Sequence, residues 1–226
     1  MKLLKEVIVK TFPVFTGYMV LGMGFGILMV KNGFGIGAVL AMSLFIYAGS
    51  MQYMGITLMT MNAGLIQTAL TTLMVNARHL FYGISMVEKY KNTGRIKPYL
   101  IFSLTDETYS LVCKEMDRGK GAALYYFLIS LCNHFYWILG SLAGGVLGNV
   151  ITFDTTGIEF SMTALFLTVF VEQWLETKQY FPALSGLSGS VLCLIIFGKD
   201  RFLIPAMLFI TASLLIYKNK HKEIEK

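Results

Sequence analysis

Charged residues are scarce in this sequence of 226 residues. They make up 14% of the chain, compared with about a quarter of an ordinary soluble domain. Hydrophobic residues account for 55%, and the mean hydropathy is +0.63. The four prolines and the lack of any run rich in Ser, Gly or Pro argue against a long linker or disordered region. The composition therefore predicts one membrane domain, residues 1–226, with no separate soluble domain.

Cysteine is also scarce, and its spacing excludes several classes of site. Cys113, Cys132 and Cys193 are odd in number and form no CxxC pair, which argues against a disulfide framework or a zinc site. The sequence has no H-E-x-x-H motif and no nucleophile elbow, so we expect no enzyme, no metal and no cofactor. The net charge of +6 is spread over short loops and both ends. That distribution favours a lipid surface over nucleic acid as the partner.

Long apolar runs are the dominant pattern, and they predict helices because hydrocarbon admits only helices or closed barrels and no dyad alternation is present. Lysines near both ends of the chain favour cytoplasmic termini. The sequence thus predicts an all-α membrane protein, a helical bundle of about seven or eight transmembrane segments. The expected segments lie near residues 13–30, 37–60, 64–87, 98–114, 121–149, 159–176, 180–198 and 201–217.

The loop that holds Lys89, Lys91 and Arg95 does not fit eight complete crossings. Eight crossings with both termini inside would place this basic loop outside, against the positive-inside bias. Either the bias is overridden here, or one segment is broken or re-entrant and does not cross. The fourth segment, near 98–114, is short and polar, and it is the first candidate.

A weak internal similarity relates the two halves of the chain. With an offset of 121 residues, Leu44, Phe45, Gln52 and Tyr53 align with the second-half residues Leu165, Phe166, Gln173 and Trp174. The halves 1–120 and 121–226 are therefore possible repeats with broken helices, although matches of this kind also arise by chance among membrane helices. Many secondary transporters are built from two repeats, with the substrate site at their interface.

The strongest candidate site centres on Arg78, which interrupts a long apolar segment. An Arg at the centre of a membrane helix costs about 2.5–3.5 kcal/mol and needs a partner or water. Asn76 and His79 share a helix face beside it. Asp106 and Glu107 are the natural counter-charges, because the planar guanidinium fork suits a carboxylate. Such a pair could simply lock two helices, but the second acid and the histidine are also typical of an ammonium site or a proton relay.

Two further residues are weaker candidates. Gln52 is an uncharged polar group in an apolar segment beside the expected path. Glu172 is a third carboxylate near the end of the sixth segment, where Trp174 and Glu176 are also typical of a membrane interface.

Two motifs resemble a known family: NARHLFYG at 76–83 and TDETY at 105–109. Together they resemble the paired signature of the AzlC family of bacterial branched-chain amino acid permeases. GYMVLGMGFG at 17–26 and YAGSMQY at 47–53 extend the resemblance. It implies export of leucine, isoleucine, valine and their analogues across the bacterial cytoplasmic membrane. It also implies a large subunit that acts with a small hydrophobic AzlD-type subunit.

The expected function is therefore a proton-coupled secondary transporter. Arg78 would hold the substrate carboxylate, and the two neighbouring acids would receive its ammonium group or a coupling proton. The apolar side chain would rest against soft residues such as Met51, Met54 and Phe81. A proton or ion channel and a scaffold subunit without a transport path remain alternatives.

Overall fold

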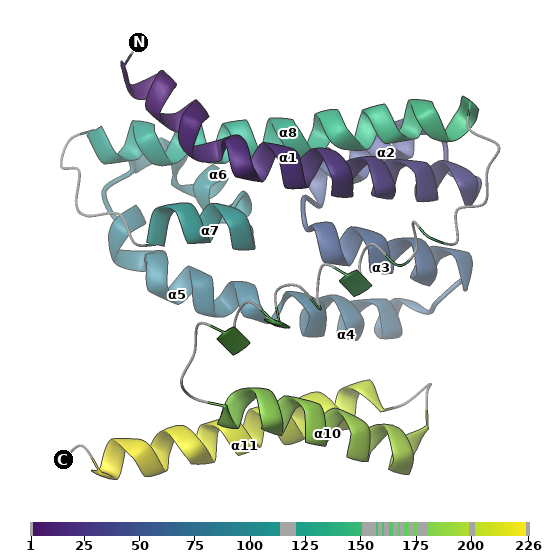
Figure 1. Cartoon of the computed structure of the whole chain (residues 1–226), viewed down its shortest axis with the longest axis vertical. Coiled ribbons are helices and arrows are strands. Elements are labelled where there is room, and N and C mark those ends of the chain that lie inside the picture. The colour runs from purple at the N-terminus through teal and green to yellow at the C-terminus, as the bar shows by residue number, and fades with distance from the viewer. Residues whose placement is uncertain are drawn as a thin grey trace. The chain divides into compact units, whose positions relative to one another are not determined.

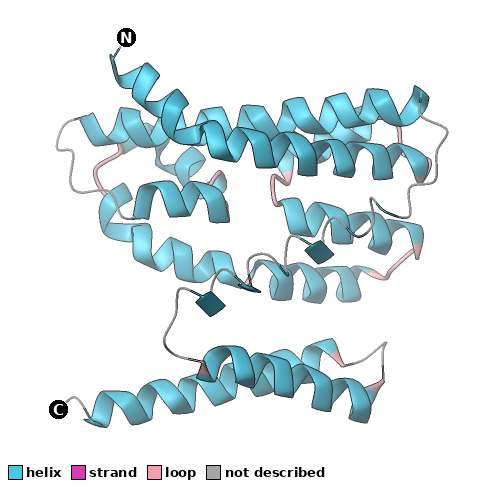
Figure 2. Ribbon diagram, in the orientation of Figure 1, coloured by secondary structure: helices cyan, strands magenta, loops and turns pink. Residues whose placement is uncertain are grey.

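The structure is a computed structural model that describes residues 2–113, 121–150, 180–198 and 202–224, with isolated positions between 157 and 175. Helices make up its regular elements, and no strand occurs in these ranges (Figure 2). The predicted all-α class is confirmed. The chain divides into two compact units, Met1–Met162 and Thr163–Lys226, and each is described by itself.

The first unit contains both continuous and broken helices. The segments predicted near 13–30 and 121–149 each form one long helix, whereas each of the three segments between them forms two short helices with a break. In chain order the elements are α1 (Lys2–Lys31), α2 (Ile36–Phe45), α3 (Gly49–Thr60), α4 (Leu65–Asn76), α5 (Arg78–Tyr90), η1 (Gly94–Ile96), α6 (Lys97–Phe102), α7 (Asp106–Cys113) and α8 (Ala122–Val150).

The two long helices, α1 and α8, run parallel and pack against each other (Figure 1). Each contains 29 residues that are apolar enough to cross a membrane, which corresponds to about 43 Å of helix against a hydrocarbon core of about 30 Å. Residues 121 positions apart meet across this interface. The rings of Phe15 and Tyr136 have centroids 5.0 Å apart, and a Cβ on Gly148 would lie 3.1 Å from Ile27 Cα. This offset equals that of the possible repeat, which stays a prediction because much of its second half lies outside the described residues.

Glycines allow the backbones of α1 and α8 to touch, and this contact provides a test of the fold. A Cβ on Gly144 would overlap the Met23 carbonyl oxygen, whereas a Cβ on Gly145 would meet no atom nearer than 3.7 Å. We therefore expect Gly144→Ala to destabilise the protein by about 1–3 kcal/mol, because overpacking forces the helices apart. Thermal unfolding in detergent should show a fall of about 2–4 °C for each kcal/mol. Gly145→Ala is the matched control, and equal unfolding temperatures for the two variants would contradict the proposed packing.

Helices α2 and α3 form a hairpin that doubles back at residues 46–48. Both arms pack near the C-terminal end of α1, since Val39 of α2 and Ile56 of α3 share a hydrophobic cluster with Phe25 and Met29. At the apex, Tyr47 has a φ of +40°. This left-handed conformation is strained for a residue other than glycine, and strain of this kind often accompanies functional sites.

Helices α6 and α7 form a second hairpin at the opposite end of α1. Lys89, at the end of α5, donates hydrogen bonds from Nζ to the carbonyl oxygens of Val112 (3.0 Å) and Cys113 (2.6 Å). The end of α7 therefore returns to the place from which α6 departs. Leu100 of α6 and Val112 of α7 lie in one cluster with Val7 of α1.

The break between α6 and α7 follows from the residues within it. Thr105 caps α7, because its Oγ1 accepts a hydrogen bond from the Thr108 backbone N–H at 3.3 Å. Two acids follow in the first turn, where the helix dipole favours negative charge. With 6 and 8 residues, α6 and α7 are about 9 and 12 Å long, too short to cross a hydrocarbon core of about 30 Å.

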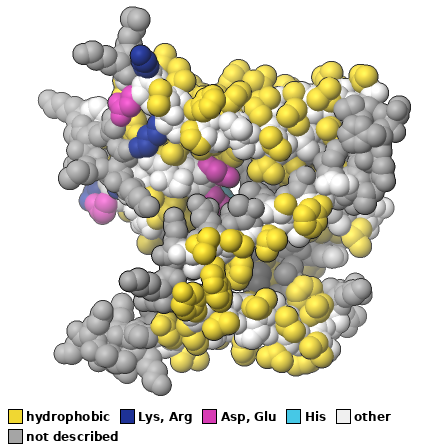
Figure 3. Space-filling model, viewed as in Figure 1, with side chains coloured by type: hydrophobic (Ala, Val, Ile, Leu, Met, Phe, Trp, Pro, Cys, Tyr) yellow, Lys and Arg dark blue, Asp and Glu magenta, His cyan; other side chains and the backbone are white. Residues whose placement is uncertain are grey.

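Charge and hydrophobicity are distributed unevenly over the first unit. Lys5 and Lys10 lie near the start of α1, and the loop with Lys89, Lys91 and Arg95 lies at the same end. On the face that Figure 3 shows, Lys and Arg lie toward that end, and hydrophobic side chains are widespread elsewhere. Many of these side chains are fully or largely exposed, as expected for helices that face lipid.

The second unit contains α10 (Phe181–Phe197) and α11 (Leu203–Ile224), which pack as an antiparallel pair. The Ser185 hydroxyl donates to the Ser213 hydroxyl oxygen at 3.0 Å, and the Phe181 and Tyr217 rings stack at 4.2 Å. The helices predicted near 180–198 and 201–217 are confirmed. Most of the segment predicted near 159–176 lies outside the described residues.

Candidate functional site

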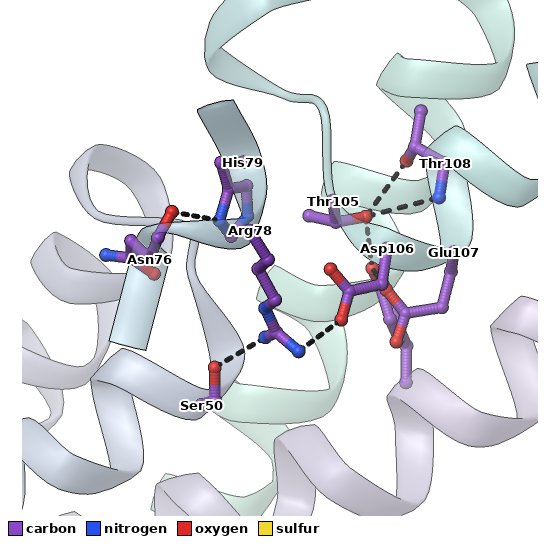
Figure 4. A network of polar contacts seen from close by, with 9 residues as sticks. Ser50, Asn76, Arg78, His79, Thr105, Asp106, Glu107 and Thr108 are labelled. Carbon is purple, nitrogen blue, oxygen red and sulfur yellow. Dashed lines mark hydrogen bonds and ion pairs between the residues drawn. The ribbon is translucent and has the colours of Figure 1, made fainter. Parts of the chain in front are cut away.

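Arg78 makes the central contacts of the site (Figure 4). One guanidinium nitrogen, Nη1, lies 2.6 Å from Asp106 Oδ2, and a second, Nη2, donates to the Ser50 hydroxyl oxygen at 2.7 Å. The expected pairing of Arg78 with an acid of the fourth segment is confirmed. All three residues lie at the start of a short helix: Ser50 in α3, Arg78 in α5 and Asp106 in α7. Three helix breaks therefore converge on one ion pair.

The ion pair lies about halfway along α1 and is accessible. Tyr18, near the middle of the span Leu3–Lys31, contacts Thr105 and Glu107, which flank Asp106. The side chains of Arg78 and Asp106 are 32% and 30% exposed. A ligand could therefore reach both charges without unfolding the unit.

Glu107 has a different environment from Asp106. Its Oε2 accepts a hydrogen bond from the Tyr18 hydroxyl at 2.7 Å, and no cation lies within ion-pair distance of it in the part of the chain that the structure describes. The same hydroxyl lies 2.7 Å from Thr105 Oγ1. The two adjacent acids thus have separate roles in the structure, since one is ion-paired and the other is held by neutral hydroxyl groups.

A series of close polar contacts links Glu107 to α8. Thr105 Oγ1 donates to Thr108 Oγ1 at 3.1 Å, and Asn133 Nδ2 of α8 donates to Thr108 Oγ1 at 3.0 Å. Thr108 and Asn133 are fully buried. The start of α7 is thereby tied to both long helices, through Tyr18 on α1 and Asn133 on α8.

His79 and Asn76 shape the break between α4 and α5. His79 Nδ1 lies 3.2 Å from the Asn76 carbonyl oxygen, while the Leu80 N–H bonds to Ala77 instead. A side chain that competes for a helical carbonyl interrupts the helix. His79 lies beside the ion pair, as Figure 4 shows, but it is not a member of the pair. Its ring faces Tyr82, with centroids 5.8 Å apart.

The two weaker candidates are not part of this network. Gln52 lies in α3 and is fully buried, and neither atom of its amide has a hydrogen-bond partner among the described residues. Buried amides normally have such partners, so Gln52 remains a candidate for contact with a polar ligand. Glu172 lies outside the described residues.

A known protein family matches most of the first unit. Residues 13–151 match the family model described as AzlC protein. The chain belongs to the AzlC family. A Bacillus subtilis (strain 168) protein named "Branched-chain amino acid transport protein AzlC" is 42% identical over 221 residues, which cover 96% of this chain and 84% of that protein.

Other AzlC-like relatives are named as membrane proteins. An uncharacterized membrane protein of Helicobacter pylori (strain J99) is 39% identical over 97% of both chains. One of Haemophilus influenzae is 41% identical over 87% of this chain and 81% of the relative. No solved structure matches this chain.

In this AzlC-family chain, the motifs at 76–83 and 105–109 supply the two sides of the ion pair. Sequence reasoning did not single out Ser50 or Tyr18, although both lie in the other two motifs of the resemblance. In the sequence, each is a residue with a hydroxyl group in a glycine-containing stretch of an apolar segment. This pattern alone is a weak indication of a functional residue. Among the described residues, no group of three His, Cys, Asp or Glu side chains could hold a metal ion.

Proposed function

We propose that this chain is a secondary transporter of the bacterial cytoplasmic membrane that exports branched-chain amino acids in exchange for protons. The observation that carries the proposal is the convergence of three helix breaks on the Arg78–Asp106 pair, halfway along α1. Discontinuous helices that meet near the middle of the membrane commonly form transporter sites. The name of the Bacillus subtilis relative supports the substrate class.

The Arg78–Asp106 pair suits an amino acid zwitterion. An amino acid that inserts between the two side chains would place its carboxylate on the guanidinium group and its ammonium on the Asp106 carboxylate. Each protein charge would then exchange one partner for another of the same sign. Neither charge would be left without a partner, so binding would avoid most of the cost of separating a partly buried pair. Ser50 would hold the guanidinium group in place during the exchange.

Glu107 is the proposed proton-carrying group. It can gain or lose a proton without breaking an ion pair with any described residue, because its partner is the Tyr18 hydroxyl. Such a change alters the charge of the site by one unit, next to the place where the ammonium group would bind. Substrate and proton would therefore influence each other's binding, which is the requirement for coupled transport.

The two hairpins support a topology with fewer crossings than the seven or eight expected. In this proposal α1, α4–α5 and α8 cross the membrane. The hairpin α2–α3 enters and leaves through one face of the membrane, and the hairpin α6–α7 enters and leaves through the other face. The N-terminus and the loop with Lys89 and Arg95 then lie on one side. The positive-inside bias makes that side cytoplasmic. A re-entrant fourth segment therefore explains why the basic loop can lie on the cytoplasmic side, together with the N-terminus.

The family resemblance supports a small hydrophobic AzlD-type membrane subunit as the partner.

The decisive test is to reconstitute the purified chain in vesicles, with and without this subunit, and to measure leucine flux driven by a pH gradient. We expect flux of leucine against its own gradient. A conductance that does not need the amino acid would indicate an ion channel instead, and the absence of flux under every imposed gradient would exclude a coupled transporter.

A further inference from the structure

A cavity lies among α2, α3 and α4, and its lining includes Met51, the residue that follows Ser50. Its volume is about 520 Å³, within the range of about 300–1,000 Å³ that is usual for small-ligand pockets. Most of its lining is apolar and includes Met42, Met51 and Met59, while Asn62 and Thr72 add polar groups.

The cavity extends from the helix breaks toward one face of the unit. At its inner end the lining includes Ile46, at the start of the turn that leads to Ser50, and Met51, directly after Ser50. Thr72 lies there too, one helical turn before Asn76. At its outer end, Asn62 belongs to the connection between α3 and α4. Met51 and Asn62 are eleven positions apart, which corresponds to about 16 Å along a helix axis. The outer end is opposite to the basic loops, since α2–α3 packs at the C-terminal end of α1.

We propose that this cavity binds the apolar side chain of the transported amino acid and connects the Arg78–Asp106 site with the non-cytoplasmic face. This inference rests on the proposed function and adds to it the specificity pocket and the side on which the site is open. Met51 of the lining directly follows Ser50, which binds Arg78, so an amino acid held at the Arg78–Asp106 pair by its charged groups could extend its side chain between α3 and α4. The polar groups of Asn62 and Thr72 distinguish the lining from a purely lipid-filled groove.

The lining chemistry fits a small set of branched side chains. Methionine is unbranched and polarizable, so its side chain can adapt to ligands of slightly different shape. Met42, Met51 and Met59 can therefore accept leucine, isoleucine and valine in the same space. Of the three residues expected from the sequence to form this pocket, Met51 lines the cavity, Met54 does not, and the Phe81 side chain is not among those described.

Gly55 sets the size of the cavity and provides the first test. Its missing side chain leaves room for the ligand, and an added Cβ would meet only the flexible end of Met42, at 3.2 Å. We expect Gly55→Leu to lower leucine transport about tenfold more than valine transport, because a single methylene group is worth about 10- to 200-fold in a tight apolar pocket. Gly37→Leu, at an exposed glycine of α2 with nothing within 4 Å, is the control and should leave the ratio unchanged. An unchanged ratio in Gly55→Leu would overturn the specificity pocket.

A second test measures access and does not depend on transport. Thr72→Cys would be prepared in a chain whose Cys113, Cys132 and Cys193 are replaced by serine. We expect a membrane-impermeant thiol reagent to label the new cysteine from outside intact cells. Leucine should reduce the labelling rate at least about fivefold, because a bound ligand excludes the reagent from the cavity. Labelling only from the cytoplasmic side, or only by a lipid-soluble reagent, would overturn the proposed opening.

The two tests separate this inference from the proposed function. If the reconstituted wild-type protein moves no leucine, the proposed function fails, whatever the labelling result. If it moves leucine but Thr72→Cys is labelled from outside without protection by leucine, the transporter stands and the cavity is not its side-chain pocket.

Discussion

Replacing Arg78 with alanine is expected to lower leucine transport at least about 30-fold, while the protein still reaches the membrane. The guanidinium group contacts both Ser50 and Asp106, and in our proposal it binds the substrate carboxylate. Removing one member of a hydrogen-bonded charge pair costs about 2–5 kcal/mol in binding, and about 1.4 kcal/mol corresponds to a factor of ten. The measurement is the initial rate of leucine uptake into vesicles that contain equal amounts of each variant.

Two further variants make the Arg78→Ala result specific. Arg95→Ala removes the same side chain from an exposed loop position, and its transport should equal that of the wild type. Arg78→Lys keeps the charge but loses the planar fork that reaches Ser50 and Asp106 together, so an intermediate rate is expected. If Arg78→Ala transports leucine at the wild-type rate, Arg78 does not belong to the substrate site.

A double variant separates a functional ion pair from one that only locks two helices. Arg78→Gln combined with Asp106→Asn removes both charges and leaves side-chain amides that can still form hydrogen bonds, although the one at position 78 is shorter than the arginine it replaces. If the pair only joins α5 to α7, this variant should be stable and active, because neutral groups can replace a partly buried ion pair at little cost. Our proposal expects a stable protein without transport, because neither charge of the zwitterion then has a partner.

The sequence predicted the ion pair because a charge in a membrane helix requires a partner. Arg78 is in the third predicted segment, and Asp106 and Glu107 are in the next segment along the chain. The choice between the two acids could not be made, since adjacent residues of a helix point about 100° apart and the orientation of α7 depends on its packing. The break in the fourth segment was also foreseeable, because Thr105 followed by two acids is a typical helix start.

The hairpin of α2 and α3 could not be foreseen in the same way. Its apex contains no proline, and Tyr47 adopts a left-handed conformation that its residue type disfavours. The interactions around it come from residues distant in sequence: the Tyr47 ring stacks on His134 of α8 with centroids 4.2 Å apart, and His134 Nε2 lies 3.1 Å from the Ser43 carbonyl oxygen. Contacts of this kind leave no local pattern, so the sequence indicated a broken helix near residues 47–52 but not that the segment doubles back on itself.

Replacing Glu107 with glutamine is expected to abolish the accumulation of leucine by a pH gradient while leucine–leucine exchange continues. Glutamine has nearly the same shape, and its side-chain oxygen can still accept the hydrogen bond from the Tyr18 hydroxyl. It cannot take up or release a proton. The binding site for the zwitterion therefore remains, but substrate movement no longer depends on the proton gradient. Exchange of labelled leucine and uphill uptake would be measured on the same vesicles.

The outcome of Glu107→Gln distinguishes the two adjacent acids. Glu88→Gln is its matched control, since the Glu88 side chain is 82% exposed and pairs only loosely with Lys91 at 3.9 Å, and this variant should behave like the wild type. Asp106→Asn should reduce exchange and uphill uptake together, because Asp106 is proposed to hold the substrate itself. If Glu107→Gln also stops exchange, Glu107 contributes to substrate binding, and the proposed division of roles between the two acids is wrong. Persistence of uphill uptake would remove Glu107 from the coupling mechanism altogether.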